Sequence, residues 1–416
     1  MFHPSFYTLS PVIGVSLIIW FSNKDEIITK ILSTKLFVGM GLISYSLYLW
    51  HYPIFAFARV TEFFGNNLIK ELSSGIVILV LSIFSYFFIE KPFRNYNFKF
   101  KKIIIILIFL ITLLFSFGYY VITENGIKNR FNDIFLIQLK EENTNFHERE
   151  NVQKIVLIGD SHSKALEHNL NEQIKINNLS FYKFDTIMYL DDFVHKDAKT
   201  QKNEREYTEK NAKISNFLKN NPNLIVILHY RWQIRLLETL YDNQEGYKEA
   251  TNLEYQNYLE PINTKTKSLQ QRQKLIKDAL ISQIKKITNQ GHKLILVYPV
   301  PEMGFNVPSH LLNRFMKEKI NDSNSIPILS GSYELYKKRN KIIFDILDNV
   351  EDPNVYRVYP HHYLCNTRLK GRCIANDEKN IFYYDDDHLS IQGSKMINNL
   401  IIKKIKKIVK NDLKNF

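Results

Sequence analysis

The stretch KIVLIGDSHSKAL, residues 154–166, decides the fold of the larger part of this 416-residue chain. Its first six residues, KIVLIG (154–159), form a short apolar run of the kind that is buried on both faces of a parallel sheet, and a helix-like sequence follows. LIVILHY (224–230) and KLILVYPV (293–300) repeat this pattern, and amphipathic stretches such as 268–289 lie between such runs. Strands that alternate with helices predict a three-layer α/β domain with a parallel sheet.

Two polar motifs, one near each end of this domain, carry the candidate chemistry. Ser161 follows the first predicted strand, where α/β sheets form their sites and where the next helix points its N–H groups at the turn. A serine hydroxyl becomes a nucleophile when a histidine, oriented by a carboxylate, removes its proton. YYDDDHLS (383–390) supplies both groups, because Asp385 and His388 are three residues apart. Alone, GDSH also fits a helix cap and DDDH a solvated turn or a loose cation site, but together they favour a Ser–His–Asp triad.

The first third of the chain contains four apolar segments that are long enough to cross a bilayer, residues 5–22, 36–58, 72–89 and 103–122. The loop KPFRNYNFKFKK, between the third and fourth segments, has five basic residues and no acidic one, which predicts that it is cytoplasmic. The fourth segment then carries the α/β domain to the outside, and the amino terminus also lies outside. An outside start of this kind predicts the tail of a longer multispanning chain.

Two ionisable residues lie in or beside these segments. His51, in SYSLYLWHYP, is at membrane depth and is a functional candidate for that reason. The structural alternative, which the sequence favours, is a hydrogen bond between helices or a place at the membrane interface beside Trp50. Glu90, in FFIEKPFR, is interpreted as an interfacial residue that pairs with Lys91 or Arg94.

Composition and charge bound the classes of function. The net charge is +13, but the basic residues are scattered or lie beside hydrophobic spans without a nucleic-acid-binding motif, so we expect no nucleic-acid partner. The lysine face of the carboxyl-terminal stretch SIQGSKMINNLIIKKIKKIVK is interpreted as solvated surface rather than as a second membrane anchor. The only cysteines, Cys365 and Cys373, are spaced for one small disulfide, which implies an oxidising compartment, and they are too few for a four-ligand zinc site without histidine partners.

These motifs resemble two known families that occur fused. IGDSHS and DDDHLS look like the first and last sequence blocks of SGNH hydrolases, and SYSLYLWHYP and FFIEKPFR are similar to the late transmembrane region of acyltransferase family 3. The fusion resembles the large bacterial O-acetyltransferases that modify surface polysaccharides. YRWQ (230–233), YPVPEMGFNVP (298–308) and the cysteine loop fit this fused type. The resemblance covers nearly the whole chain.

The resemblance implies a division of the chain and a place for it in the cell. Residues 1–122 are expected to be a partial acyltransferase family 3 transmembrane region, residues 123–152 a linker, and residues 153–416 an SGNH-like domain. We expect a multi-pass protein of the bacterial inner membrane with its carboxyl-terminal domain in the periplasm.

The resemblance also assigns roles to the site residues. Ser161 is expected to be the nucleophile, His388 the general base and Asp385 the carboxylate that orients it. Asp386 or Asp387 is an alternative to Asp385, because the choice depends on spacing and resemblance.

The chain departs from the usual SGNH pattern in its oxyanion donors. No glycine lies between Gly159 and Gly246, and Arg231 stands where an asparagine block is usual. The remaining candidate donors are the backbone N–H of Ser161 and the side chain of Arg231, for which a surface ion pair is the alternative. One missing donor costs about 10²–10³ in rate, so we expect slow turnover unless it is replaced.

The expected function is transfer of O-acetyl groups to a cell-envelope polysaccharide, lipopolysaccharide among them, through an acyl-serine intermediate. The alternatives are a membrane-anchored carbohydrate O-acetylesterase and an inactive truncated remnant. The resemblance implies that the amino-terminal helices, which handle the acyl donor, are missing. We therefore expect acetyl-CoA to be used by a separately encoded amino-terminal membrane half, and this chain to bind no cofactor or metal itself.

Overall fold

The chain divides into two compact units, Met1–Gly126 and Ile127–Phe416. The computed structural model describes residues 9–60, 68–94, 100–124, 152–197, 205–249, 257–318 and 327–412. Apart from residues 123, 124 and 152, the predicted linker 123–152 lies outside the described residues.

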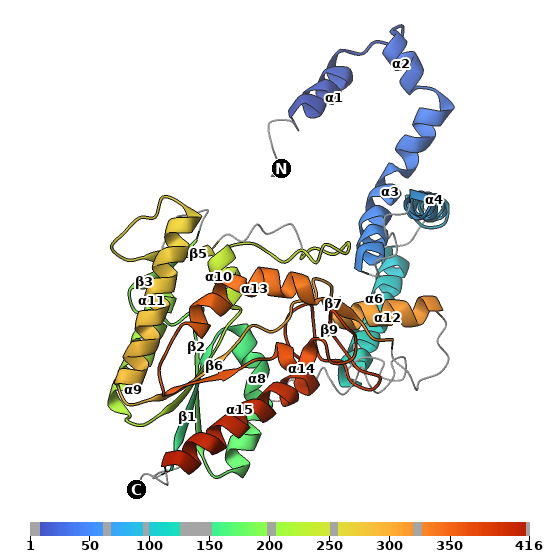
Figure 1. Cartoon of the computed structure of the whole chain (residues 1–416). Helices are drawn as coiled ribbons and strands as arrows, with labels where there is room; N and C mark the ends of the chain where they lie inside the picture. The colour runs from blue at the N-terminus through green and yellow to red at the C-terminus, as the bar shows by residue number, and fades with distance from the viewer. Residues whose placement is uncertain are drawn as a thin grey trace. The chain divides into compact units, whose positions relative to one another are not determined.

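The described part of the amino-terminal unit is mainly helical (Figure 1). Its elements are α1 (Leu9–Phe21), α2 (Ile27–Leu32), α3 (Lys35–Val60), α4 (Leu68–Ser85), the π-helical turn η2 (Tyr86–Glu90), α5 (Lys91–Phe93) and α6 (Phe100–Thr123).

Two helical stretches among the described residues, Glu71–Phe93 and Ile104–Thr123, are long and apolar enough to cross a membrane. They coincide with the third and fourth predicted segments. α1 has 13 residues, which at 1.5 Å per residue span roughly 20 Å of a hydrocarbon core of about 30 Å. α3 has 26 residues, but its tyrosines, serines, histidine and proline lower its hydropathy. The prediction of four membrane spans is therefore not confirmed.

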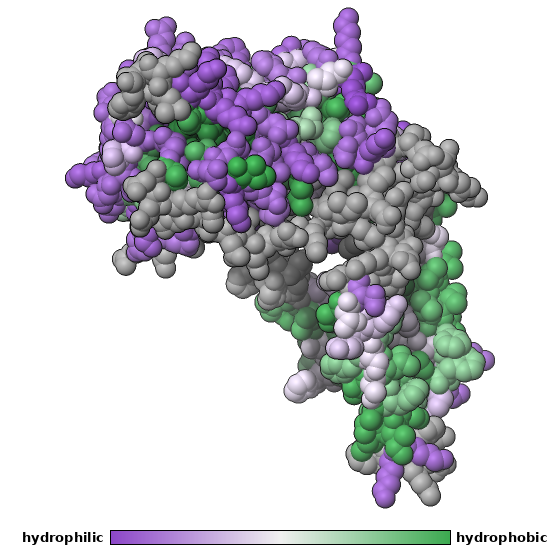
Figure 2. Space-filling model, turned by 90° about the horizontal axis from the view of Figure 1, so that it is seen from below, coloured by the Kyte–Doolittle hydropathy of each residue, from purple (hydrophilic) through white to green (hydrophobic). Residues whose placement is uncertain are grey.

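The helices of this unit expose their apolar side chains. Phe115, for example, is 76% exposed, and most described side chains of α1, α4 and α6 are large, hydrophobic and at least partly exposed. Figure 2 shows hydrophobic surface in green. Soluble proteins rarely expose apolar surface on this scale, so these helices require lipid or other apolar partners.

Polar side chains link α3 to the end of α4 and to η2. Trp50 Nε1 donates to Ser85 Oγ at 2.7 Å, and Ser46 Oγ donates to Glu90 Oε2 at 3.1 Å. The other oxygen of Glu90 pairs with Arg94 at 3.1 Å, which confirms one of its two predicted partners. Glu90 therefore joins α3 to the basic loop that follows η2.

His51 has a partner within its own helix. Its Nδ1 lies 2.5 Å from the carbonyl oxygen of Tyr48, and the two rings are 5.4 Å apart. This contact lies within α3 and is not the predicted hydrogen bond between helices, so both interpretations of His51 stay predictions.

The carboxyl-terminal unit is built on a five-stranded sheet with the order β2-β1-β4-β6-β8, in which every neighbouring pair is parallel. The strands are β1 (Lys154–Gly159), β2 (Ser180–Asp185), β4 (Ile225–His229), β6 (Lys293–Val297) and β8 (Val355–Val358). The three strands predicted from the sequence are the three central ones. The predicted parallel α/β architecture is confirmed.

Helices and two small antiparallel sheets complete this unit (Figure 1). The helices are α8 (Ser161–Ile176), α9 (Arg205–Asn220), α10 (Trp232–Leu237), α11 (Leu269–Asn289), α12 (Val307–Glu318), α13 (Tyr333–Asp348), α14 (His361–Leu364) and α15 (Ile391–Asp412). The small sheets pair β3 (Phe193–Asp197) with β5 (Asn257–Pro261) and β7 (Ser330–Ser332) with β9 (Arg372–Ile374). α11 matches the helix predicted over 268–289.

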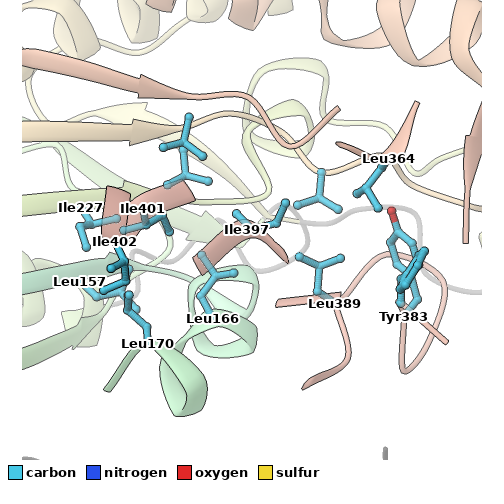
Figure 3. Packing of buried hydrophobic residues seen from close by; sticks show 14 of the residues in the cluster. Leu157, Leu166, Leu170, Ile227, Leu364, Tyr383, Leu389, Ile397, Ile401 and Ile402 are labelled. Atoms are coloured by element: carbon cyan, nitrogen blue, oxygen red, sulfur yellow. The ribbon is translucent and has the colours of Figure 1, made fainter. Parts of the chain in front are cut away.

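Strand β1 is buried on both faces because its side chains alternate between two cores. Ile155 and Leu157 belong to the core that includes α8 and α15, where Figure 3 shows Leu157 beside Leu170. Val156 and Ile158 belong to the core that includes α9, α11 and α13. The sheet is therefore the middle of three layers.

The last helix of the chain packs against the first helix of the α/β unit. α15 contacts α8, and Asn398 Nδ2 donates to the carbonyl oxygen of Leu166 at 2.9 Å. The lysines of α15 are exposed or half-exposed while five of its six isoleucines are buried, as predicted for a solvated face. Because α15 begins three residues after His388, this packing fixes the end of the DDDH loop close to the start of α8.

Cys365 and Cys373 form a disulfide at the end of α14 and in β9. Both cysteines are buried, and the bond closes the loop between these two elements.

Candidate active site

The turn after β1 requires glycine at its last strand position. A Cβ atom on Gly159 would lie 1.9 Å from the carbonyl oxygen of His229 in β4 and 2.5 Å from the Cβ of Ser163. No side chain fits in this space, so β1 and β4 approach closely here. The next residues, Asp160 and Ser161, are thereby placed at the carboxyl edge of the sheet.

Asp160, and not Ser161, caps α8. Its side chain accepts the backbone N–H of His162 at 3.1 Å and the backbone N–H of Arg231 at 3.1 and 3.2 Å. Asp160 therefore joins the start of α8 to the end of β4. Ser161 is the first residue of the helix, its side chain is exposed, and its own N–H is among those that no helix carbonyl can accept.

The structure brings together the three residues that the sequence analysis selected. Ser161 Oγ lies 2.7 Å from His388 Nε2, and His388 Nδ1 lies 2.8 Å from Asp385 Oδ2. The other oxygen of Asp385 accepts the backbone N–H of His388 at 2.7 Å and that of Asp387 at 3.0 Å. Asp385 is thus held by its own loop, in the orientation that a Ser–His–Asp relay requires.

His388 has an unusual pKa for a histidine in this position. Burial alone would lower the pKa, but the hydrogen bonds of Asp385 and Asp387 outweigh burial and raise the pKa of His388 to about 10. The ring of Tyr384 stacks on the imidazole with ring centroids 5.2 Å apart. The resting imidazole therefore carries a proton at neutral pH.

The other two members of the aspartate triplet differ from each other. Asp387 is buried and lies 2.7 Å from the same nitrogen of His388 that Asp385 contacts. Asp386 is hydrogen-bonded through its backbone, whose carbonyl accepts the N–H of Met303 at 2.8 Å. Burial, together with the neighbouring charges of Asp387 and Asp385, raises the pKa of Asp386 to about 6. Asp385 and Asp387, but not Asp386, are therefore bonded to the candidate base among the described residues.

The structure gives no support to the candidate role of Arg231 as an oxyanion donor. Its guanidinium is committed to carboxylates, with nitrogens 2.7 Å from Glu249, 2.5 Å from Glu302 and 2.9 Å from Asp387. Its backbone N–H is committed to Asp160. Ion pairing, which is the alternative, is present, but its expected surface position is not, because the Arg231 side chain is 11% exposed.

The ion pairs continue away from the site into the core. Glu302, whose side chain is 2% exposed, also binds Arg339 at 2.5 Å, and Glu249 accepts the backbone N–H of Tyr241 at 3.0 Å. Burial opposes the charge of Arg231, but the carboxylates of Glu302, Glu249 and Asp387 raise its pKa above the usual value. Sequence reasoning missed this network, although Glu302 lies within the quoted stretch YPVPEMGFNVP.

His162 is the second histidine at the site besides His388, and the sequence analysis did not predict its role. It follows the candidate nucleophile directly, its side chain is buried, and its Nε2 lies 3.3 Å from Asp387 Oδ2. Its ring centroid is 4.6 Å from that of His388. The motif GDSH contains this histidine, but its contact with Asp387 is made only in the folded chain.

The side chains of His162, Asp387 and His388, and those of Asp385, Asp386 and Asp387, are close enough to share a cation, with ligand atoms within 4.8 Å of one another. The guanidinium of Arg231 already lies 2.9 Å from Asp387. A further positive charge at this carboxylate would be repelled by Arg231, so the donor set does not favour a metal ion.

Comparison with known proteins places this geometry in a family. Residues 133–403, about two thirds of the chain, match the family described as SGNH domain (fused to AT3 domains). The chain belongs to this family. The predicted resemblance is therefore confirmed, and O-acetyltransferases are among the chain's relatives.

Three curated relatives align with short parts of this SGNH-family chain. It is 29% identical over 89 residues to the putative peptidoglycan O-acetyltransferase YrhL of Bacillus subtilis (strain 168), and the match covers 21% of this chain and 14% of the relative. It is 32% identical over 88 residues to the peptidoglycan O-acetyltransferase OatA of Listeria monocytogenes, again covering 21% and 14%. It is 39% identical over 80 residues to the O-acetyltransferase OatA of Staphylococcus aureus (strain NCTC 8325 / PS 47), covering 18% and 13%. The chain thus matches only a small fraction of the length of these relatives.

Two solved structures are similar to the chain. The periplasmic domain of a lipopolysaccharide acetyltransferase from Salmonella ser. Paratyphi A aligns with 62% of this chain and 85% of its own, at 22% identity and a TM-score of 0.41. An acetyl xylan esterase, AlAXEase, aligns with 61% of this chain and 99% of its own, at 12% identity and a TM-score of 0.32.

Proposed function

We propose that the α/β unit transfers O-acetyl groups to a cell-envelope polysaccharide through an acyl-serine intermediate on Ser161. The observation that carries the proposal is the alignment of Ser161 Oγ, the His388 ring and Asp385, with separations of 2.7 and 2.8 Å. The curated relatives that are named as peptidoglycan O-acetyltransferases support the choice of a cell-envelope glycan as the acceptor.

The proposed reaction has two symmetric halves. In the first, the neutral His388 Nε2 takes the proton of Ser161 as Oγ attacks the acyl carbonyl carbon. The oxygen that gains negative charge faces the amino-terminal end of α8, where the N–H of Ser161 stabilises it. The imidazolium, paired with Asp385, then gives its proton to the leaving group of the donor, and acetyl-Ser161 remains.

In the second half, a sugar hydroxyl of the acceptor takes the place of the leaving group. His388 Nε2 removes the hydroxyl proton as the sugar oxygen attacks the acetyl carbonyl of the acyl-enzyme. Collapse of this intermediate breaks the bond to Ser161 Oγ, which recovers the proton from His388. The products are the O-acetylated glycan and the starting enzyme. Attack by water in place of the sugar hydroxyl gives the esterase alternative.

The proposal includes a location. We place the helices of residues 1–122 in the bacterial inner membrane, with four spans and with the basic loop after η2 on the cytoplasmic side. Residues 153–416 then follow the linker 123–152 into the periplasm. The two long apolar helices and the exposed apolar side chains of this unit support the membrane assignment. The acyl group is proposed to come from acetyl-CoA.

The test uses the whole chain in detergent micelles, with the disulfide intact and an aryl acetate as the acyl donor. Wild type is compared with Ser161→Ala and His388→Ala, which we expect to lose activity by roughly 10⁴-fold or more if the triad is fully assembled. Ser163→Ala is the matched control. Ser163 lies two positions after Ser161 in α8, and its hydroxyl donates to the carbonyl oxygen of Asp160 at 2.7 Å. We expect the control to retain activity.

Acceptors decide between transfer and hydrolysis. Soluble peptidoglycan fragments or lipopolysaccharide are added to the same reaction, and the product is analysed for acetate and for O-acetylated sugar. O-acetylated sugar supports the transferase, and free acetate alone supports the esterase. A folded wild type that shows no Ser161-dependent turnover of the aryl acetate would contradict both.

A further inference from the structure

The side of His388 that faces away from Ser161 has two carboxylates on one nitrogen. Nδ1 lies 2.8 Å from Asp385 Oδ2 and 2.7 Å from Asp387 Oδ1. The imidazole has one hydrogen at this position, so a single carboxylate would be enough to fix the tautomer. The second carboxylate is also the more deeply buried one, with the Asp387 side chain 4% exposed against 25% for Asp385.

The two aspartates are held by different parts of the molecule. Asp385 is anchored by backbone N–H groups of its own loop. Asp387 is anchored from outside the loop, because its Oδ2 lies 2.9 Å from Arg231 Nε, next to α10, and 3.3 Å from His162 Nε2, in α8. Asp387 therefore connects the loop that carries His388 to α8, which begins with Ser161, and to the segment between β4 and α10.

We propose that Asp387 is a second positioning residue of the site, which ties the DDDH loop to Arg231 and His162 and so keeps His388 opposite Ser161. Its role, which rests on the proposed function of the triad, is distinct from that of Asp385. Asp385 orients the ring within the loop, and Asp387 fixes the loop against the sheet edge and adds a second negative charge beside the ring.

The charge of Asp387 is maintained by its surroundings. Burial alone would raise the pKa of Asp387, but the hydrogen bond and charge of His162, followed by His388 and Arg231, hold it well below its usual range. Arg231 is itself shared with Glu249 and Glu302. The carboxylate of Asp387 is therefore ionised in the folded protein at neutral and alkaline pH.

Several charged and titratable groups surround the base. Those that face His388 are Asp385, Asp387 and Tyr384 from its own loop, Ser161 and His162 from α8, and His229 from β4. Burial, followed by the charge of His162, lowers the pKa of His229 to about 3, so this ring is neutral. The negative charge that favours the imidazolium form of His388 thus comes from the two aspartates.

Removal of the Asp387 charge should lower the pKa of His388, because one of the two carboxylates at Nδ1 is then neutral. A negative charge beside Nδ1 stabilises the imidazolium, and an opposite charge at this range changes a pKa by about 1 to 3 pH units. Asp387→Asn keeps the shape of the side chain and removes its charge, so the pKa of His388 should fall by about 1 to 3 pH units. The acid limb of the rate profile should move to lower pH by the same amount.

The test is a pH titration of His388 by nuclear magnetic resonance, in the whole chain in detergent micelles with isotope-labelled histidine. The chain has 12 histidines, and a His388→Gln sample identifies the signal. Asp386→Asn is the matched control, because it removes the same charge from the same loop without a described contact to His388. We expect the shift in Asp387→Asn to be at least twice that in the control. Equal shifts, or none in Asp387→Asn, would overturn the proposal.

A second variant tests the contribution of Asp387 to the pKa of His388 if Asp387→Asn does not fold. In Asp385→Asn, Asp387 is the remaining carboxylate at Nδ1, and we expect the pKa of His388 to stay above the ordinary value of about 6.5. A fall to that value would show that Asp387 contributes nothing. The titration needs no turnover, so it can fail or succeed independently of the Ser161-dependent activity that tests the proposed function.

Discussion

His388 has to satisfy two opposing demands at the scale of a single residue. The carboxylates that hold its ring opposite Ser161 also raise its pKa to about 10, and a protonated imidazole cannot accept the serine proton. Deprotonation of His388 therefore limits the fraction of chains that can react at neutral pH. A substrate that displaces water from the site changes this balance, because burial favours the neutral ring.

The first prediction concerns the pH dependence of the rate. Because the active form of His388 is the neutral one, and its pKa is raised rather than lowered, kcat/KM for an aryl acetate should rise with pH from neutrality to about 10. An unperturbed histidine would give an acid limb near 6.5. The profile is measured in the whole chain with background hydrolysis subtracted. A plateau already reached at pH 7 would contradict the assigned environment of His388.

The second prediction concerns Arg231, which pairs with the buried carboxylates of Glu302 and Asp387 and with the half-buried carboxylate of Glu249. Arg231→Gln leaves Glu302 with Arg339 and Asp387 with His162 and His388 as remaining partners. Loss of a buried partner costs up to about 3–5 kcal/mol of the free energy of unfolding, and we expect a loss of more than about 1 kcal/mol here. The loss is measured by denaturant unfolding of the α/β unit within the whole chain, followed by the fluorescence of the buried Trp232.

Arg368→Gln is the control for this experiment. Its pair with Glu378 is exposed, with the two side chains 44% and 46% exposed, so its loss should cost less than about 1 kcal/mol. Equal costs for the two variants would show that the Arg231 network does not stabilise the fold.

At the scale of elements, the central strands could be predicted and the edge strands could not. β1, β4 and β6 are continuous apolar runs because both their faces are covered. β2 (SFYKFD) and β8 (VYRV) are at the edges and contain charged or half-buried residues, so they lack this signal. The short strands β7 and β9, of three residues each, gave no recognisable pattern.

The candidate site could also be predicted only in part from the sequence, for a different reason. Ser161, Asp385 and His388 lie in short motifs whose spacing carries chemical meaning, so the sequence indicated them. Two partners of Arg231, Glu249 and Glu302, are 18 and 71 residues away in the sequence, and Asp387 is farther still. Only the folded chain brings them together. Nothing in a single sequence distinguishes Glu302 or Glu249 from a surface carboxylate. Which members of the aspartate triplet contact His388 could be decided only from the structure.

The third prediction concerns the loop between α14 and β9. Its disulfide joins cysteines eight residues apart, and closing a loop of this size restricts the unfolded chain by about 2–3 kcal/mol. A Cys365→Ala and Cys373→Ala double variant should unfold at correspondingly lower denaturant concentration. Reduced wild type is the control and should behave like the variant. Unchanged stability in both would contradict a stabilising role for this bond.

At the scale of the whole molecule, the two units have opposite surfaces. The described helices of the amino-terminal unit expose large apolar side chains, whereas the α/β unit buries its apolar residues in two cores (Figures 2 and 3). Such a contrast is expected when one unit is solvated by lipid and the other by water.

The fourth prediction tests the topology that this contrast suggests. In a bacterial host with an outer membrane, alkaline phosphatase fused after Phe416 should be active, because that enzyme folds only outside the cytoplasm. The same fusion placed in the basic loop after η2 should be inactive. The reverse result would contradict the proposed orientation, and activity of neither fusion would contradict membrane insertion.

The most direct measurement of the central claim is the detection of the acyl-enzyme itself. The whole chain is mixed with an aryl acetate at alkaline pH without an acceptor, quenched with acid, digested and analysed by tandem mass spectrometry. We predict an acetyl group on Ser161 in wild type, none on Ser161 in His388→Ala, and loss of the label when a glycan acceptor is added before the quench. Turnover without acetylation of Ser161, or equal labelling in His388→Ala, would contradict a Ser161 nucleophile activated by His388.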